Sequence, residues 1–185
     1  MSSKRDKNVV NLILNPALPF GIEQREEEGN ERKSDDEEKC SKLPNYRQSE
    51  ELSLEGVNLA EKGDFENAME KFDEAIKVCP ENASPYNNRA QLFRLLSKIP
   101  EALRDLEKAL ELCGAKGRIA AQSFVQKALI HQFRGEEAMA KADFEQAAKL
   151  GSTFAKNQLI AMNPYAAMCN KMLGEMMSKF RREEH

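Results

Sequence analysis

The fold is decided by the stretch SEELSLEGVNLAEKGDFENAMEKFDEAIKVCPEN, which covers residues 49–82. The same pattern returns in residues 83–116 and again in residues 121–154, and this period of 34 residues is typical of a helix–turn–helix array. The third copy starts four residues late, after Gly117–Ala120. Those four residues lengthen either a connection or the start of a helix.

Small residues recur at fixed positions of the three repeats and alternate with large apolar residues. Small side chains let two helix backbones approach closely, and the large residue fills the space towards the next helix. The sequence therefore predicts an all-α fold of three stacked helix pairs. The predicted structural residues are Gly56, Ala68, Phe72, Ala75, Ala90, Ala102, Ala128, Ala140, Phe144 and Ala147.

Turn and capping residues divide the repeats into helices. Gly63 predicts a left-handed turn and Asp64 the N-cap that follows it, while Ser84-Pro85 predicts the cap and first residue of the third helix. Pro100 is expected at the start of the fourth helix. The predicted helices cover about 46–62, 65–78, 85–97, 100–112, 118–133, 136–150, 153–162 and 164–180.

The repeats resemble those of the tetratricopeptide repeat family. The fourth position holds Leu52, Tyr86 and Phe124, and the first repeat also has the expected proline, Pro80. This resemblance implies a right-handed superhelix of three helix pairs in residues 45–154. The ends of such arrays need a cap, so residues 155–185 are expected to form a C-terminal capping helix pair.

The first 44 residues carry no repeat. Residues 1–20 contain a short apolar segment, Val9–Phe20, in which Pro16 and Pro19 favour an extended or turned path. It is either a terminal helix packed on the array, a motif for a partner, or an internal ligand for the groove of the array. Residues 21–44 are rich in acidic residues and predict a disordered linker, giving a partly disordered N-terminal tail.

Near the C-terminus, Met168, Met172 and Met176 are spaced by four residues and lie on one helix face. Two interpretations remain open for this stripe. It packs against the end of the array as part of the cap, or it forms an adaptable surface for a partner.

Composition excludes several classes of function. The net charge of −3 implies no general attraction to nucleic acid, and no apolar run approaches the roughly 20 residues of a membrane span. Met1–Asn8 does not resemble a signal peptide. A cytoplasmic protein is expected, with the nucleus as an alternative location.

Catalytic and metal-binding patterns are absent from the sequence. The four cysteines form no C-x-x-C pair, so neither a metal nor another cofactor is expected. His131 stands without a nucleophile in a recognisable context and predicts a buried, hydrogen-bonded histidine between helices. These observations predict a protein that is not an enzyme.

In the family that the repeats resemble, the first helix of each pair lines a peptide groove. Carried onto this chain, the inward positions predict a groove of amides and apolar side chains: Ser53, Val57, Asn88, Gln91, Gln122, Gln126, Leu129 and Phe133. Some family members clamp the acidic C-terminus of heat-shock chaperones with lysine, arginine and asparagine. Of those clamp positions only Asn88 keeps its residue type here, so we expect the groove to favour an uncharged segment.

A small three-repeat branch of the family is similar along nearly the full length. The similarity rests on Asn15-Pro16, on Pro19-Phe20-Gly21, on YNNRAQ at residues 86–91 and on Asn163-Pro164. It implies a non-enzymatic adaptor or co-chaperone that binds proteins or peptides. Heat-shock chaperones are one implied partner, and an enzyme of tyrosine breakdown is another. The alternative is a stabiliser that binds a folded client enzyme through its outer surface.

Overall fold

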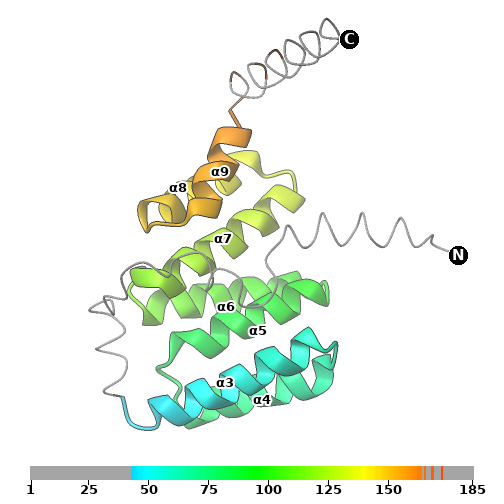
Figure 1. The fold of residues 1–185 in the computed structure, drawn as a ribbon, viewed down its shortest axis with the longest axis vertical. Helices are drawn as coiled ribbons and strands as arrows, with labels where there is room; N and C mark the ends of the chain where they lie inside the picture. The colour runs from blue at the N-terminus through cyan, green and yellow to red at the C-terminus, as the bar shows by residue number, and fades with distance from the viewer. Residues whose placement is uncertain (1–42, 164, 166–167, 169–171, 173–185) are drawn as a thin grey trace, which may run out of the picture. The chain divides into compact units, whose positions relative to one another are not determined.

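The computed structural model describes residues 43–163 together with residues 165, 168 and 172. Helices and turns make up this part of the chain, with no strand among the described residues, and the all-α prediction is confirmed (Figure 1). The N-terminal motif, most of the acidic linker and most of the last predicted helix lie outside the described residues. The helices are α3 (Tyr46–Glu61), α4 (Phe65–Val78), α5 (Ala83–Leu95), α6 (Ile99–Leu112), α7 (Gly117–Phe133), α8 (Glu137–Lys149) and α9 (Thr153–Ala161).

The chain forms two compact units, of which the first ends at Ile119 and the second begins at Ala120. In the first unit, α3 packs against α4 and α5 packs against α6, with further contacts of α5 with both α3 and α4. In the second unit, α8 packs against α9. In the first unit the two helices of each repeat therefore pair as the 34-residue period predicts.

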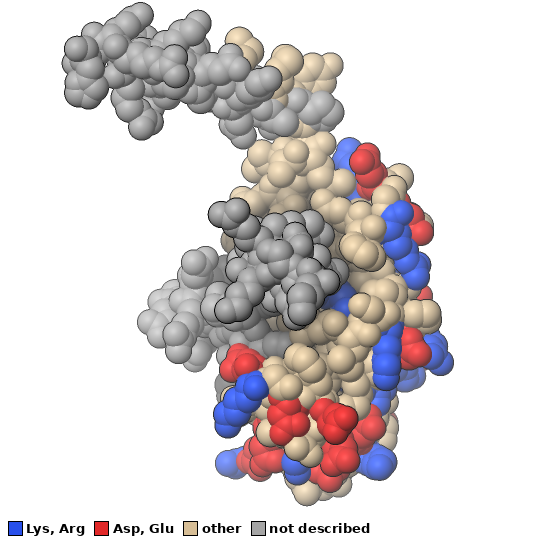
Figure 2. Space-filling view, turned by 90° about the vertical axis from the view of Figure 1, so that its right-hand side faces the viewer, with Lys and Arg blue, Asp and Glu red and all other residues tan. Residues whose placement is uncertain are grey.

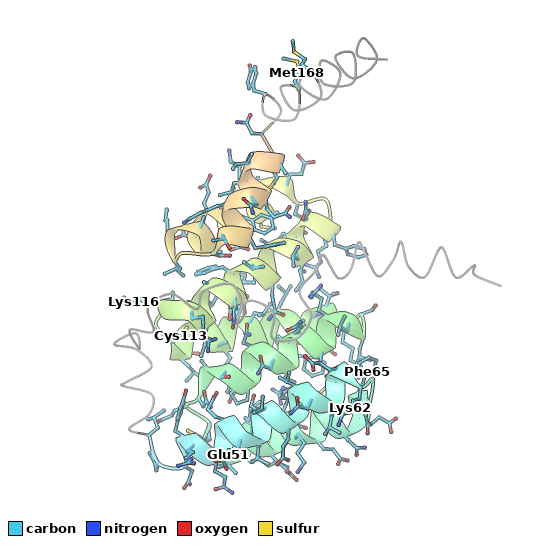
Figure 3. All side chains as sticks on the ribbon, in the orientation of Figure 1. Glu51, Lys62, Phe65, Cys113, Lys116 and Met168 are labelled. Carbon is cyan, nitrogen blue, oxygen red and sulfur yellow. The ribbon has the colours of Figure 1, made fainter. Side chains whose placement is uncertain are left out.

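Local turn chemistry sets the boundary between α3 and α4. Gly63 has a φ of 83°, a left-handed conformation that glycine adopts without steric cost. The Asp64 carboxylate accepts a hydrogen bond from the backbone N–H of Asn67 at 3.4 Å, and so caps α4 as predicted. Lys62 and Phe65 flank this turn (Figure 3).

The predicted start of α5 was wrong by two residues. The N-cap is Asn82, not Ser84, because Oδ1 of Asn82 accepts a hydrogen bond from the backbone N–H of Ser84 at 3.0 Å. Pro85 falls within the first turn, where its missing N–H is not needed. The earlier cap is favoured by contacts of Asn82 with α3, which local sequence does not reveal.

Asn82 is buried and belongs to a hydrogen-bond network that joins three helices. Its Nδ2 donates hydrogen bonds to Oγ of Ser49 at 3.1 Å and to Oε1 of Glu50 at 2.7 Å. Ser49 in turn donates to the carbonyl oxygen of Ala75 at 2.9 Å. The start of α3, the end of α4 and the start of α5 are therefore joined by one network.

The four-residue slip of the third repeat lies at the start of a helix. Helix α7 begins at Gly117 and has 17 residues, whereas α5, its counterpart in the second repeat, has 13. Of the two alternatives, the extra residues therefore extend a helix and not a connection.

The small and large residues of the repeats form the core. All nine predicted alanine and phenylalanine positions are fully buried, and Gly56 is buried as well. A Cβ atom placed on Gly56 would lie 2.7 Å from Cε1 of Phe72, which is closer than van der Waals contact allows. In the second unit the ring of Phe144 lies against that of Phe154, with centroids 6.3 Å apart.

An ion pair joins the two helices of every repeat at the same two positions, the seventh and the twenty-third. The pairs are Glu55–Lys71 at 3.4 Å, Arg89–Asp105 at 2.7 Å and Lys127–Asp143 at 3.8 Å. The polarity of the first pair is reversed relative to the other two. The first pair is the most exposed, while the side chains of the second and third are largely buried. The sequence interpretation missed this pattern.

Arg89 extends its ion pair to a second helix. Its guanidinium donates to both oxygens of Asp105, at 2.7 and 2.8 Å, and to Oδ1 of Asp73 on α4 at 2.6 Å. The aromatic rings of Tyr86 and Phe93 lie 5.6 and 5.7 Å from its Cζ. Burial alone would lower the pKa of Arg89, but the hydrogen bonds of the two carboxylates outweigh burial and raise it. Arg89 therefore holds α4, α5 and α6 together as a cation.

Charged side chains gather over α3 and α4, as Figure 2 shows at its lower end. The ion pairs Arg47–Glu51 and Lys71–Glu74 contribute to this surface and are largely exposed. Exposed pairs of this kind contribute about 0–1 kcal/mol each, so they favour solubility more than stability. None of the helices in the described residues is long and apolar enough to cross a membrane.

Candidate functional site

The first four predicted groove residues lie on α3 and α5, which contact each other in the first unit. We define the α3/α5 face by Ser53, Leu54 and Val57 on α3 and by Asn88 and Gln91 on α5. The spacings of three and four residues place the members of each helix on one side of it.

A hydrogen bond connects the two helices in the middle of this face. Nδ2 of Asn88 donates to Oγ of Ser53 at 3.0 Å, and Ser53 is buried beneath it. Asn88 itself is half-buried. One N–H of its amide is used by Ser53, while the carbonyl oxygen can accept and the second N–H can donate. Asn88 can therefore bind the backbone of an extended peptide.

The rest of the face is apolar or neutral. Val57 is half-buried and packs against the core cluster that contains Phe72 and Leu92. Gln91 is half-buried on α5. Leu54 is 61% exposed although it is a large apolar residue. Together, the exposed Leu54 and the amides of Asn88 and Gln91 can contact both the side chains and the backbone of a bound segment.

The predicted groove residues named above are all uncharged. The same inward positions also include Glu50 and Glu61 on α3 and Arg94 on α5. Glu50 accepts the hydrogen bond from Asn82, and Glu61 is exposed. Arg94 is only 5% exposed, and burial lowers the pKa of its guanidinium. The centre of the face is neutral, but its margins on α3 are acidic.

The other four predicted groove residues lie in the second unit on α7. Gln122, Gln126, Leu129 and Phe133 follow one another at spacings of four, three and four residues and share one side of the helix. Gln126 is buried, Gln122 and Leu129 are half-buried, and Phe133 is exposed. These four residues remain predicted members of a binding site.

The α3/α5 face lacks the residues of a charged clamp. Ser53 and Val57 occupy positions where the resemblance implies a lysine and an asparagine in chaperone-binding members of the family. Hydrogen bonds between charged groups are about twice as strong as neutral ones, so their absence weakens recognition of a terminal carboxylate. The arrangement suits an uncharged, extended segment instead.

His131 has the structural surroundings that the sequence predicts. Its Nδ1 lies 2.5 Å from Oε2 of Glu136, its Nε2 lies 3.5 Å from Oδ2 of Asp143, and the side chain is mostly buried. Asp143 also pairs with Lys127. Within the part of the chain that the structure describes, no cluster of three or more histidine, cysteine, aspartate or glutamate residues could hold a metal.

The second unit also carries exposed apolar side chains. The described ones are Phe133, Met139, Ile160, Tyr165, Met168 and Met172. Met168 and Met172 are each 56% exposed, and Figure 3 shows Met168 beyond the end of α9. Met176 lies outside the described residues, so both interpretations of the methionine stripe, a cap and a partner surface, stay predictions.

Comparison with known proteins agrees with these features. A family model described as "TPR repeat" matches residues 56–96, and one described as "Tetratricopeptide repeat" matches residues 121–150. Helix pairs of this period and packing define a tetratricopeptide repeat array. Such arrays are protein-interaction modules.

Tetratricopeptide repeat protein 36 from Homo sapiens is 46% identical over 184 residues, covering 98% of this chain and 97% of the relative. The relatives from Danio rerio and Caenorhabditis elegans are 44% and 48% identical, and each match covers all of this chain and at least 97% of the relative. The chain therefore belongs to the tetratricopeptide repeat protein 36 family.

A solved structure is also similar. The second TPR of Spaghetti (RPAP3), bound to the HSP90 peptide SRMEEVD, is 27% identical with a TM-score of 0.50. The match covers 56% of this chain and 93% of that one. This neighbour supports a role in binding proteins or peptides.

Proposed function

We propose that this chain is an adaptor that binds an extended, uncharged segment of a protein partner along its α3/α5 face. The observation that carries the proposal is the half-buried Asn88, held in place by Ser53 and flanked by neutral side chains. Amides placed in this way recognise a peptide backbone without requiring charge. Leu54 and Val57 add apolar contact area.

The neighbour RPAP3 binds an HSP90 peptide that ends in acidic residues. Ser53 and Val57 give this chain no cation for such an end, and Glu50 and Glu61 repel it. Losing a hydrogen bond to a charged group typically lowers affinity by about 1.5–3 kcal/mol. A heat-shock chaperone therefore remains a proposed partner through a surface other than the carboxylate clamp.

The test compares three forms of the full chain: wild type, Asn88→Ala and Asn157→Ala. Asn157 is an exposed residue of α9 and serves as a matched control. Immobilised protein is exposed to cytosol, and captured proteins are quantified by mass spectrometry. The peptide SRMEEVD is titrated in parallel by fluorescence polarisation.

We expect a set of captured proteins that is lost with Asn88→Ala and kept with Asn157→Ala. We also expect no saturable binding of SRMEEVD. Capture that is identical for all three proteins would refute binding through this face. Tight SRMEEVD binding that depends on Asn88 would refute the neutral character of the ligand.

A second candidate function is stabilisation of a folded client enzyme. The exposed apolar side chains of the second unit support it, because they offer apolar area that a folded client could cover. By resemblance to the three-repeat branch, the client would be a dioxygenase of tyrosine breakdown. Met168→Ser with Met172→Ser should then abolish protection of the purified enzyme against heat inactivation. Asn88→Ala should leave that protection unchanged.

A further inference from the structure

We propose that residues 9–20 of this chain bind its own α3/α5 face and so regulate access of partners to it. This inference rests on the function proposed above, because it assigns an occupant to the same face. The segment lies outside the described residues, so the case is made from the chemistry of the face, from the sequence and from the length of the connecting chain.

The face selects against acidic ligands and accepts neutral ones. Its centre consists of Ser53, Leu54, Val57, Asn88 and Gln91, none of which carries a charge. Leu54 offers an exposed apolar contact, and Asn88 offers a backbone-binding amide. A carboxylate placed at this centre would lose hydration without meeting an exposed cation, since Arg94 is buried.

The segment VVNLILNPALPF matches that chemistry. Its 12 residues contain no charge, and its aliphatic side chains need apolar contacts. The two prolines disfavour a continuous helix and favour the extended conformation in which backbone groups remain available to an amide. Lys4, Arg5 and Lys7 precede the segment and complement the acidic margin of α3, where Glu61 is exposed.

The connecting chain is long enough to bring the segment to the face. About 25 residues separate Phe20 from Tyr46, and a flexible chain of that length has a root-mean-square span of about 25–30 Å. Helix α3 has 16 residues and is therefore about 24 Å long. Leu54 and Val57, near its middle, are within reach without stretching the connection.

Because the connecting chain keeps residues 9–20 near the α3/α5 face, even weak binding is effective. A connection of this length gives the segment an effective concentration on the order of 1 mM. A segment with a dissociation constant of about 100 µM would then cover the face about ten times more often than it leaves it open. A partner that needs the open face would show an apparent dissociation constant about tenfold higher.

The experiment uses the full chain and a fluorescent synthetic peptide of residues 8–21 as the probe. The test variant replaces three aliphatic residues at once, as Leu12→Ser, Ile13→Ser and Leu14→Ser. The control carries Glu26→Gln, Glu27→Gln and Glu28→Gln in the linker. A third protein adds Leu54→Asp to the test variant, a change at an exposed position that leaves the core intact. Fluorescence polarisation measures the affinity for the probe.

We expect the test variant to bind the probe about tenfold more tightly than wild type and the linker control. Leu54→Asp should remove that gain. Equal affinity of wild type and test variant, or no saturable binding to the test variant, would overturn self-binding. A gain that survives Leu54→Asp would overturn the assignment to this face. None of these results affects the dependence of protein capture on Asn88, which tests the proposed function separately.

Discussion

Replacing Gly56 by alanine should test how the first repeat is packed. Gly56 lies on α3 against the ring of Phe72, which is fully buried. An added Cβ would lie 2.7, 2.9 and 3.1 Å from three carbon atoms of that ring. The ring cannot rotate away freely, because its surroundings in the core are closely packed.

The expected magnitude follows from two opposing effects. Forcing an extra carbon into a packed core costs about 1–3 kcal/mol. Replacing glycine in a helix by alanine favours the helix by about 0.5–1 kcal/mol. We therefore expect Gly56→Ala to lower the free energy of unfolding by about 1–2 kcal/mol.

A double-mutant cycle with Phe72→Leu separates the two effects. Phe72→Leu alone should cost about 1–2 kcal/mol, because it leaves a partly unfilled core site. In that background Gly56→Ala meets no ring and should stabilise the protein by about 0.5–1 kcal/mol. Urea unfolding of the full chain, followed by far-ultraviolet circular dichroism, measures all four free energies.

Gly63→Ala is the matched control. Gly63 has a φ of 83° with no atom near the added carbon, so alanine there suffers backbone strain of about 1–2 kcal/mol. Phe72→Leu should not rescue this strain. The reasoning on Gly56 is refuted if Gly56→Ala is as stable as wild type, or if Phe72→Leu fails to reverse its effect.

Three further changes probe the polar network. Asn82→Ala should lower the free energy of unfolding by about 2–3 kcal/mol in urea unfolding, because the cap of α5 and both donated hydrogen bonds are lost; a change below about 0.5 kcal/mol would contradict this role. Arg89→Lys should cost about 1.5–3 kcal/mol, since lysine cannot bond two carboxylates in the same geometry, whereas the exposed Lys108→Arg should change little. Burial raises the pKa of Asp143 from its ordinary value of 3.8, although the positive charge of Lys127 opposes this. The free energy of unfolding of wild type, relative to that of Asp143→Asn, should therefore fall as the pH rises above 3.8 through the folded pKa of Asp143. A rise of wild-type stability relative to Asp143→Asn over this pH range would contradict the raised pKa.

The helices and the core could be predicted because their signals are local and repeated. Close packing of Gly56 against Phe72 requires a small and a large residue at fixed positions, and the 34-residue period shows both. Gly63 with Asp64 likewise marks a turn and a cap within two residues. These features needed no knowledge of distant contacts.

The start of α5 was mispredicted because the decisive contact is distant. Both Asn82 and Ser84 are suitable caps by residue type. Asn82 is selected by its hydrogen bond to Ser49, a residue 33 positions earlier in the chain. No pattern near residue 82 reveals that contact.

The candidate site could be predicted only in part. The period identifies the helix positions that hold Asn88 and Gln91, but the hydrogen bond from Asn88 to Ser53 depends on how α3 packs on α5. Arg94 occupies an inward position that the resemblance also implies, but it was not named among the predicted groove residues. The repeated ion pairs were overlooked for a similar reason: comparing the repeats by side-chain size does not reveal complementary charges.

The reversed polarity of the first ion pair restricts which helices can partner one another. If α3 took the place of α5 as the partner of α6, Glu55 would face Asp105, and if α5 took the place of α3 as the hairpin partner of α4, Arg89 would face Lys71. Both mismatched hairpins bring like charges together in place of a pair, which disfavours them relative to the native pairing. Exchange of equivalent elements is a characteristic folding error of repeat proteins. The reversed pair thus distinguishes the first hairpin from the other two, whereas the second and third hairpins carry ion pairs of the same polarity.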